Sequence, residues 1–223
     1  GLARSLLIAS FFVVSCVRRI WFRWICAGLS VIGLFLIGSR AELYGFIMAF
    51  SFCELTLNRN SRAMQAGFAL ALFLAVIVIA DNFDYLSASR QFEIFNLSDS
   101  TSWQARQYLQ SFAISQIESS PISGVYGGHL ALGEGGYAHN ALSAWVSLGL
   151  PGFVLYISLC IVAFVTSLRG LKVNLSSRIA RMAVMVSFAT VMLIVASQPV
   201  FWVVPGLAWG LALAVSVEHR RYR

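Results

Sequence analysis

Three basic side chains could together act on a phosphate-linked substrate, although they lie far apart in the sequence. Arg40 closes a Gly-Ser-Arg motif, Arg106 closes a Trp-Gln-Ala-Arg motif, and His139 precedes an asparagine. The guanidinium group of arginine is a planar fork that binds phosphate oxygens in pairs. A neutral histidine can take a proton from a hydroxyl group. These residue types therefore fit phosphate binding combined with general base catalysis.

Each of the three side chains also has a plain structural explanation. Arg40 lies between two apolar runs, where an arginine can extend to lipid headgroups. Arg106 can be solvated, or paired with Glu93 or Asp99. His139 can cap a helix or lie at the membrane interface. At a helix start the dipole disfavours the imidazolium form, which would keep His139 neutral near pH 7.

The elements that must position these residues are expected to cross a membrane. Of the 223 residues, 59% are hydrophobic and only 11% are charged, whereas a soluble domain carries roughly 25% charged residues. The mean hydropathy is +0.78. We therefore expect an all-α fold, a polytopic transmembrane helix bundle. Six spans of near the usual length, about 20 residues, are predicted at 24–38, 41–57, 63–80, 151–168, 182–197 and 199–217, and 5–17 is a partial one.

The basic residues predict the orientation of these spans. Twelve of them cluster in alternate connections, which the positive-inside rule places in the cytoplasm: Arg18, Arg19, Arg23, Arg59, Arg62, Arg169, Lys172, Arg178, Arg181, Arg220, Arg221 and Arg223. Arg40, Arg90 and Arg106 fall on the opposite, outer face. Because membrane orientation accounts for the net charge of +7, no nucleic-acid partner is expected.

The outer face carries one long connection, 81–137, which divides the chain into helices 1–80, this loop, and helices 138–223. Within the loop, Thr101 or Ser102 can cap a helix. Apolar residues then recur at helical spacing until Pro121. We expect this helix to lie along the membrane surface. The sequence Gly-Leu-Pro-Gly at 149–152 is expected to bend the next helix into the membrane.

Other kinds of site find little support. Cys16, Cys26, Cys53 and Cys160 all lie in apolar stretches and form no CxxC pair, so neither a disulfide framework nor a zinc site is indicated. The acidic pair in 81–84 lacks further metal ligands nearby. No phosphate-cradling glycine loop, nucleophile elbow or dinucleotide motif is present. We expect no metal and no cofactor.

The motifs match a known family when they are taken in order. Gly-Ser-Arg at 38–40, Trp-Gln-Ala-Arg at 103–106, Pro-Ile-Ser-Gly-Val-Tyr-Gly at 121–127, His-Asn at 139–140 and Gly-Leu-Pro-Gly at 149–152 resemble those of the O-antigen ligase and polymerase family of bacterial envelope proteins. The resemblance covers about residues 33–165. Family members usually have ten or more spans, so we expect the chain to be a C-terminal fragment.

The resemblance implies an integral-membrane inverting glycosyltransferase that uses neither a metal nor a nucleotide sugar. Its donor would be a glycan on undecaprenyl pyrophosphate, and its acceptor lipid A core, another lipid-linked glycan or a protein. Arg40 and Arg106 would bind the pyrophosphate, His139 would be the base, and Trp103 and Asn140 would help to bind the substrate. The active site would face the periplasm from the bacterial inner membrane, with other envelope polysaccharide assembly proteins as partners.

Two other classes of protein remain open. A transporter or flippase would suit the broken helices at 149–152 and at Pro199 and Pro205, but coupling usually needs an ionisable residue within the spans, and these have almost none. A non-catalytic subunit of a polysaccharide assembly complex would have the same topology without activity.

Overall fold

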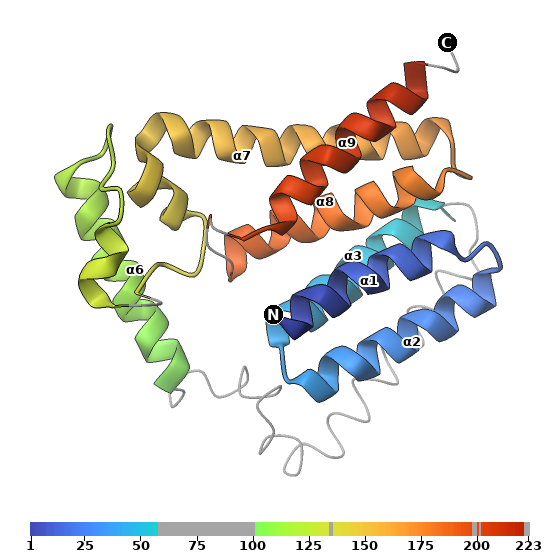
Figure 1. Ribbon diagram of the computed structural model, residues 1–223, viewed down its shortest axis with the longest axis horizontal. Coiled ribbons are helices and arrows are strands. Elements are labelled where there is room, and N and C mark those ends of the chain that lie inside the picture. Colours follow the sequence, from blue (N-terminus) through green and yellow to red (C-terminus); the bar gives the residue numbers. More distant parts are fainter. Residues whose placement is uncertain (58–100, 134–135, 198–199, 201, 221–223) are drawn as a thin grey trace. The chain divides into compact units, whose positions relative to one another are not determined.

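The computed structural model of the protein describes residues 1–57, 101–133, 136–197, 200 and 202–220. All regular structure in these ranges is helical, as the sequence predicts, and they contain no strand. The chain divides into two compact units, Gly1–Ser100 and Thr101–Arg223. The first unit contains α1 (Leu2–Cys16), α2 (Ile20–Ile37) and α3 (Arg40–Leu57). The second contains α6 (Thr101–Ser119), the short 3-10 helix η3 (Gly128–Leu132), α7 (Leu142–Val173), α8 (Arg178–Ala196) and α9 (Val204–Arg220) (Figure 1).

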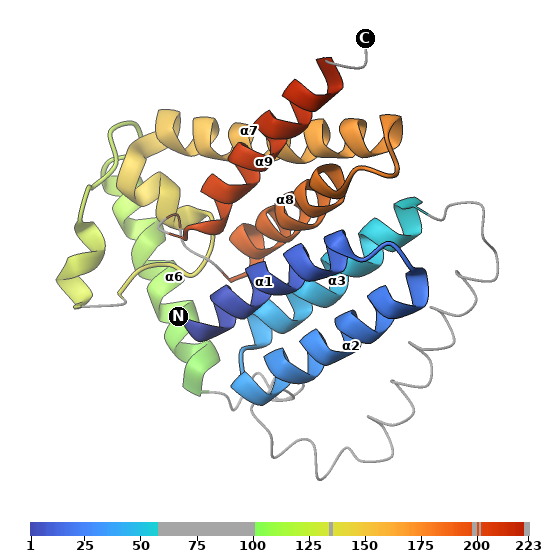
Figure 2. The ribbon, with the colours of Figure 1, turned by 45° about the vertical axis from the view of Figure 1, so that its right-hand side comes forward.

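The three helices of the first unit pack side by side and are joined by two short connections (Figure 2). Phe11 and Phe46 are fully buried between α1 and α3, with their ring centroids 5.5 Å apart. Gly38 ends α2 in the left-handed conformation, with φ of 78°, and its N–H donates to the Phe35 carbonyl. Glycine adopts this conformation without a steric penalty. The chain therefore reverses at once into α3, which begins with Arg40.

An ion pair is buried between α2 and α3. The guanidinium of Arg23 meets the carboxylate of Glu54 twice, at 2.7 Å from Nε to Oε1 and at 3.0 Å from Nη2 to Oε2. The two side chains are only 8% and 4% exposed. The sequence places Arg23 in a cytoplasmic connection before a span starting at residue 24, whereas α2 begins at Ile20 and includes it. A charged residue can lie inside this helix because its partner is fixed on the next one.

Three of the described helices, α2, α7 and α8, are long and apolar enough to cross a bilayer. The protein is therefore a membrane protein by the length and composition of its helices. The partial span at 5–17 corresponds to α1, which has 15 residues, and the expected spans at 41–57 and 199–217 correspond to α3 and α9. The expected span at 63–80 lies outside the described residues, as do residues 81–100 and 134–135 of the loop 81–137.

In the second unit α7, α8 and α9 contact one another, and α6 packs against α7 (Figure 1). The prediction of a bend at 149–152 is confirmed, because Gly149 interrupts α7 with φ of 66° and ψ of −178°. Pro151 follows and has no N–H to donate. The break predicted near Gln198 and Pro199 falls between α8 and α9, although both residues lie outside the described ranges.

Candidate functional site

The candidate site lies in the second unit, where α6 and the loop before α7 meet. As the sequence predicts, α6 begins at Thr101 and ends before Pro121. Its small residue Ala113 packs with Ala138 of the loop and Val146 of α7, and all three are buried. The apolar stripe of α6 thus packs on protein at this point. This contact fixes the loop that carries His139 against the helix that carries Arg106.

His139 and Arg106 are close enough to interact electrostatically. The His139 ring is half-buried, whereas Arg106 is exposed on α6. Burial of the ring, and then the positive charge of Arg106, lower the pKa of His139 below its usual value of 6.5. The sequence predicts this direction but assigns it to the helix dipole, and here burial and Arg106 cause it. The lowered pKa favours the neutral form of His139, which lies near an exposed cation.

The rings of His139 and Tyr137 also lie near each other. Their centroids are 5.0 Å apart, and their planes are inclined by 55°. Residues 137 and 139 point to the same region because the residue between them, Ala138, is turned into the core. Tyr137 is thus a neighbour of the candidate base that the sequence motif contains but does not single out.

Asn140 has a clear structural role. Its Oδ1 accepts a hydrogen bond from the N–H of Leu142 at 3.0 Å. Its carbonyl accepts from the N–H of Ser143 at 3.1 Å and from the Ser143 hydroxyl at 2.8 Å. These bonds satisfy donors in the first turn of α7, which have no partner within the helix. Asn140 therefore fixes the residue that precedes it, His139, relative to α7.

Ser143 connects this loop to a distant part of the chain. While its hydroxyl donates to Asn140, its oxygen accepts from the N–H of Val200 at 2.7 Å. Ser143 is almost completely buried. The hydroxyl thereby holds the His139 loop and the connection between α8 and α9 together. No sequence signal marks Ser143, an isolated serine in an apolar run, because the contact with residue 200 is tertiary.

The turn after α6 approaches the bend of α7 very closely. The Val125 N–H donates to the Val146 carbonyl at 2.6 Å. A Cβ atom on Gly124 would lie 2.5 Å from the Gly149 nitrogen and 2.7 Å from the Val146 oxygen. Both glycines have positive φ. Gly124 of the motif 121–127 and Gly149 of the motif 149–152 are therefore explained by packing, since no larger residue fits at either position.

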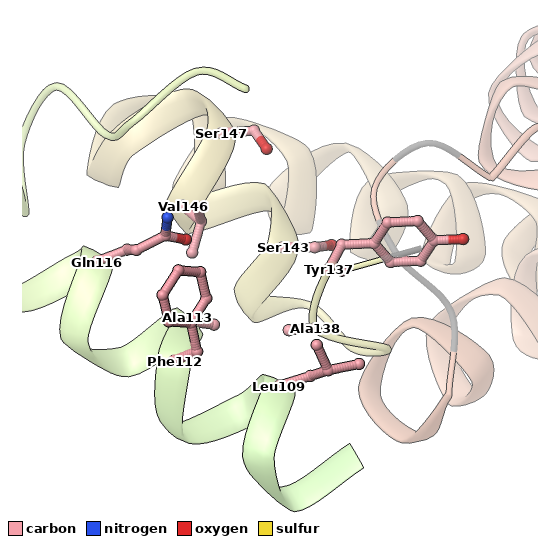
Figure 3. A pocket seen from close by; sticks show the side chains of 10 residues that line it. Leu109, Phe112, Ala113, Gln116, Tyr137, Ala138, Ser143, Val146 and Ser147 are labelled. Carbon is pink, nitrogen blue, oxygen red and sulfur yellow. The ribbon is translucent and has the colours of Figure 1, made fainter. Parts of the chain in front are cut away.

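A small pocket lies between α6, the loop and α7 (Figure 3). Leu109, Phe112 and Gln116 of α6 lie opposite Val146 of α7, while the Tyr137 ring points away from them. The pocket has room for about one water molecule. It is thus a packing gap and too small for a glycan or a pyrophosphate. Any such substrate would have to lie on the exposed side, where Arg106 is.

Arg40, the third of the predicted basic site residues, does not belong to the unit that contains His139 and Arg106. Arg40 belongs to the first unit, as the first residue of α3, and lies near Tyr44 on the next turn. Near it, the Ser39 hydroxyl donates to the Glu42 carboxylate, and Arg4 of α1 lies 3.8 Å from that carboxylate. Arg4 is thus at the same end of the first unit as Arg40.

Two other expectations are only partly covered by the described residues. Trp103 lies in α6, but its side chain is outside what the structure describes. Arg90, Glu93, Asp99 and the acidic pair in 81–84 are outside it altogether. Elsewhere in the described ranges, no three His, Cys, Asp or Glu side chains come together as a metal site would require.

Comparison with known proteins adds no relative. No protein-family model, no curated protein and no solved structure matches the chain.

Proposed function

We propose that the protein is an integral-membrane inverting glycosyltransferase of the O-antigen ligase and polymerase type. It would transfer a glycan from undecaprenyl pyrophosphate to a hydroxyl group of a second glycan, at the periplasmic face of the bacterial inner membrane. The observation that carries this proposal is the pairing of a half-buried histidine of lowered pKa with an exposed arginine. The order of the sequence motifs supports it.

The chemistry assigns one step to each side chain. His139 takes the proton of the acceptor hydroxyl, whose oxygen then attacks the anomeric carbon of the donor. The bond from that carbon to the pyrophosphate oxygen breaks, and its electron pair leaves with the pyrophosphate. The negative charge that grows on the leaving oxygen is offset by the Arg106 guanidinium. The lowered pKa of His139 favours the deprotonated ring, which is the form that can accept this proton.

The family resemblance gives Arg40 the role of a second pyrophosphate ligand, and Trp103 and Asn140 roles in substrate binding. For Arg40 the support is its motif and its position at the start of α3. Asn140 would act chiefly by fixing His139, since its Oδ1 and its carbonyl bind the first turn of α7. The same proposal includes the polytopic topology, with the loop 81–137 in the periplasm.

The test is the surface polysaccharide of cells that make the protein in its natural length. His139→Ala and Arg106→Ala should each abolish the polymer and leave the amount of protein in the membrane unchanged. Arg178→Ala is the matched control, because Arg178 is also an exposed arginine of the second unit, at the start of α8. Normal polymer in both of the first two variants would contradict the proposal.

Gel electrophoresis of the surface polysaccharide distinguishes the ligase from the polymerase activity. A deletion strain that shows unmodified lipid A core would indicate a ligase. Core that bears a single repeat would indicate a polymerase.

A further inference from the structure

The turn that follows α6 has an unusual surface. We define the uncharged turn as residues 120–132, which contain no Asp, Glu, Lys or Arg. Three of its large apolar side chains point outward: Ile122 is 71% exposed, Tyr126 85% and Leu130 64%. Burying such a side chain contributes about 1.5–3 kcal/mol relative to leaving it in water. Three of them on one short segment therefore indicate that this surface is covered in the working protein.

The turn is held firmly on the first part of α7. The Pro121 carbonyl accepts hydrogen bonds from the N–H of Leu150 at 3.1 Å and from the indole N–H of Trp145 at 2.8 Å. The contact of Gly124 with Gly149 and the bond from Val125 to Val146 add to this attachment. The height of the turn along α7 is thus fixed at the Gly149 bend.

The bend marks the beginning of the membrane-spanning part of α7. After it, 150–173 is an apolar helix longer than the roughly 20 residues that a bilayer requires. Its outer surface is apolar from the start, with Leu150, Val154 and Leu155 all exposed. In a membrane this surface faces lipid. Because Pro121 is bonded to Leu150, the turn with its exposed side chains lies beside the start of this apolar helix.

Trp145 indicates the same level in the membrane. Its indole N–H is bonded to the turn, and its ring stacks on Phe153 at a centroid distance of 5.1 Å. Tryptophan and tyrosine are typical of the boundary between acyl chains and headgroups, where one end of the ring is apolar and the other polar. Trp145 and Tyr126 are both suited to that boundary.

We propose that the uncharged turn dips into the membrane, with Ile122, Tyr126 and Leu130 inserted among the lipids of the leaflet at the start of the α7 span. Lipid fits better than a partner protein for two reasons: the turn is bonded to the start of the apolar 150–173 helix, and it contains no Asp, Glu, Lys or Arg that would resist burial. The turn then anchors the end of α6 to the membrane. This inference is independent of the proposed transferase activity.

Nitroxide labels in bilayers test this directly. The chain, with its four native cysteines replaced by alanine, is labelled at Ile122→Cys or Tyr126→Cys and reconstituted in vesicles of phosphatidylethanolamine and phosphatidylglycerol. Two positions serve as references: Val154→Cys on the exposed side of the α7 span, and Glu118→Cys on the exposed last turn of α6. Collisions with oxygen report lipid, and collisions with a water-soluble nickel chelate report water.

At positions 122 and 126 the ratio of oxygen to nickel collisions should equal that at Val154 and exceed that at Glu118 severalfold. A ratio equal to that at Glu118 overturns the proposal, because the turn is then in water. Low collision rates with both reagents overturn it too, since protein then covers the turn.

A second measurement keeps the native cysteines, two of which are buried. A photo-crosslinking phenylalanine analogue at Tyr126 should form adducts with phospholipid acyl chains in intact membranes, and the same analogue at Glu118 should not. Absence of lipid adducts at position 126, while position 154 forms them, overturns the proposal.

Discussion

Arginine is used in opposite ways in the two units. Between α2 and α3, the Arg23 guanidinium is buried and closed onto the Glu54 carboxylate by two short contacts. On α6, the Arg106 guanidinium is exposed and lowers the pKa of a half-buried histidine. A buried arginine that is paired with a carboxylate has its charge compensated, so its role is structural. An exposed arginine beside a neutral base can reach an anionic ligand.

The largest effect is expected at the buried pair. Arg23→Ala leaves the Glu54 carboxylate buried without its partner, which should reduce the free energy of unfolding by about 3–5 kcal/mol. Arg106→Ala should change it by no more than about 0.5 kcal/mol, because the side chain is exposed. Denaturant titration in detergent micelles measures the free energy of unfolding of both variants. An equal loss of stability in the two would show that burial does not distinguish the roles of Arg23 and Arg106.

The double variant Arg23→Met with Glu54→Leu sharpens this result. Replacing both charges by apolar groups of similar size should restore most of the stability, because no buried charge is left unpaired. If the double variant is as unstable as Arg23→Ala, packing and not charge is responsible.

For activity we expect the reverse, a larger effect from replacing Arg106 than from replacing Arg23. Arg106→Ala should slow glycan transfer by about two to three decades, or roughly 2.7–4 kcal/mol of activation free energy, because a donor to the leaving oxygen is lost. Arg106→Lys should recover only part of this, since an ammonium group cannot bind two oxygens in one plane. The measurement is the rate of glycan transfer by the purified variants in proteoliposomes. Full activity of Arg106→Ala would show that Arg106 takes no part in transfer.

A smaller effect is expected at Ser143, whose hydroxyl connects Asn140 with Val200. Ser143→Ala removes the acceptor of the Val200 N–H and should cost about 1–3 kcal/mol of stability, with a lower transfer rate because the His139 loop is released. Ser147→Ala is the control, since Ser147 is also buried, one turn further along α7, and takes no part in these bonds. Equal behaviour of the two variants would show that the link does not position His139.

The smallest effect is a shift in pH dependence. The rate should fall as the pH drops through the lowered pKa of His139, because the protonated ring cannot accept a proton. Arg106→Gln removes one of the two causes of the lowering, so the pKa should rise, and the decline in rate should begin at a higher pH. Nuclear magnetic resonance titration of the three histidines, assigned with His139→Ala, measures the pKa itself. An unchanged pKa in Arg106→Gln would show that the two side chains do not interact.

Much of the local structure follows from the sequence. The start of α6 near Thr101, its end before Pro121 and the bend at Gly149 are all predictable, because each depends on residues near one another in the chain. The direction of the pKa shift at His139 is predictable as well, although its cause is not. Burial and the approach of Arg106 arise only once α6 has packed on the loop.

What the sequence did not yield depends on contacts between distant segments. The sequence places Arg23 in a connection because it is one of three arginines that follow the first apolar run. Only its pairing with Glu54, at nearly the same distance on the other side of the Gly38 reversal, explains its place in α2. A search for opposite charges placed symmetrically about short connections would have found this pair. No comparable signal exists for the bond between Ser143 and Val200.

Glycan transfer in proteoliposomes, with undecaprenyl-pyrophosphate glycan as the donor and a defined acceptor, tests the proposed role of His139 and Arg106 most directly. The protein in its natural length should transfer the glycan, and His139→Ala should do so about two to three decades more slowly while inserting and folding normally. Transfer by His139→Ala at the unaltered rate, or no transfer by the intact protein on any lipid-pyrophosphate glycan, would contradict it.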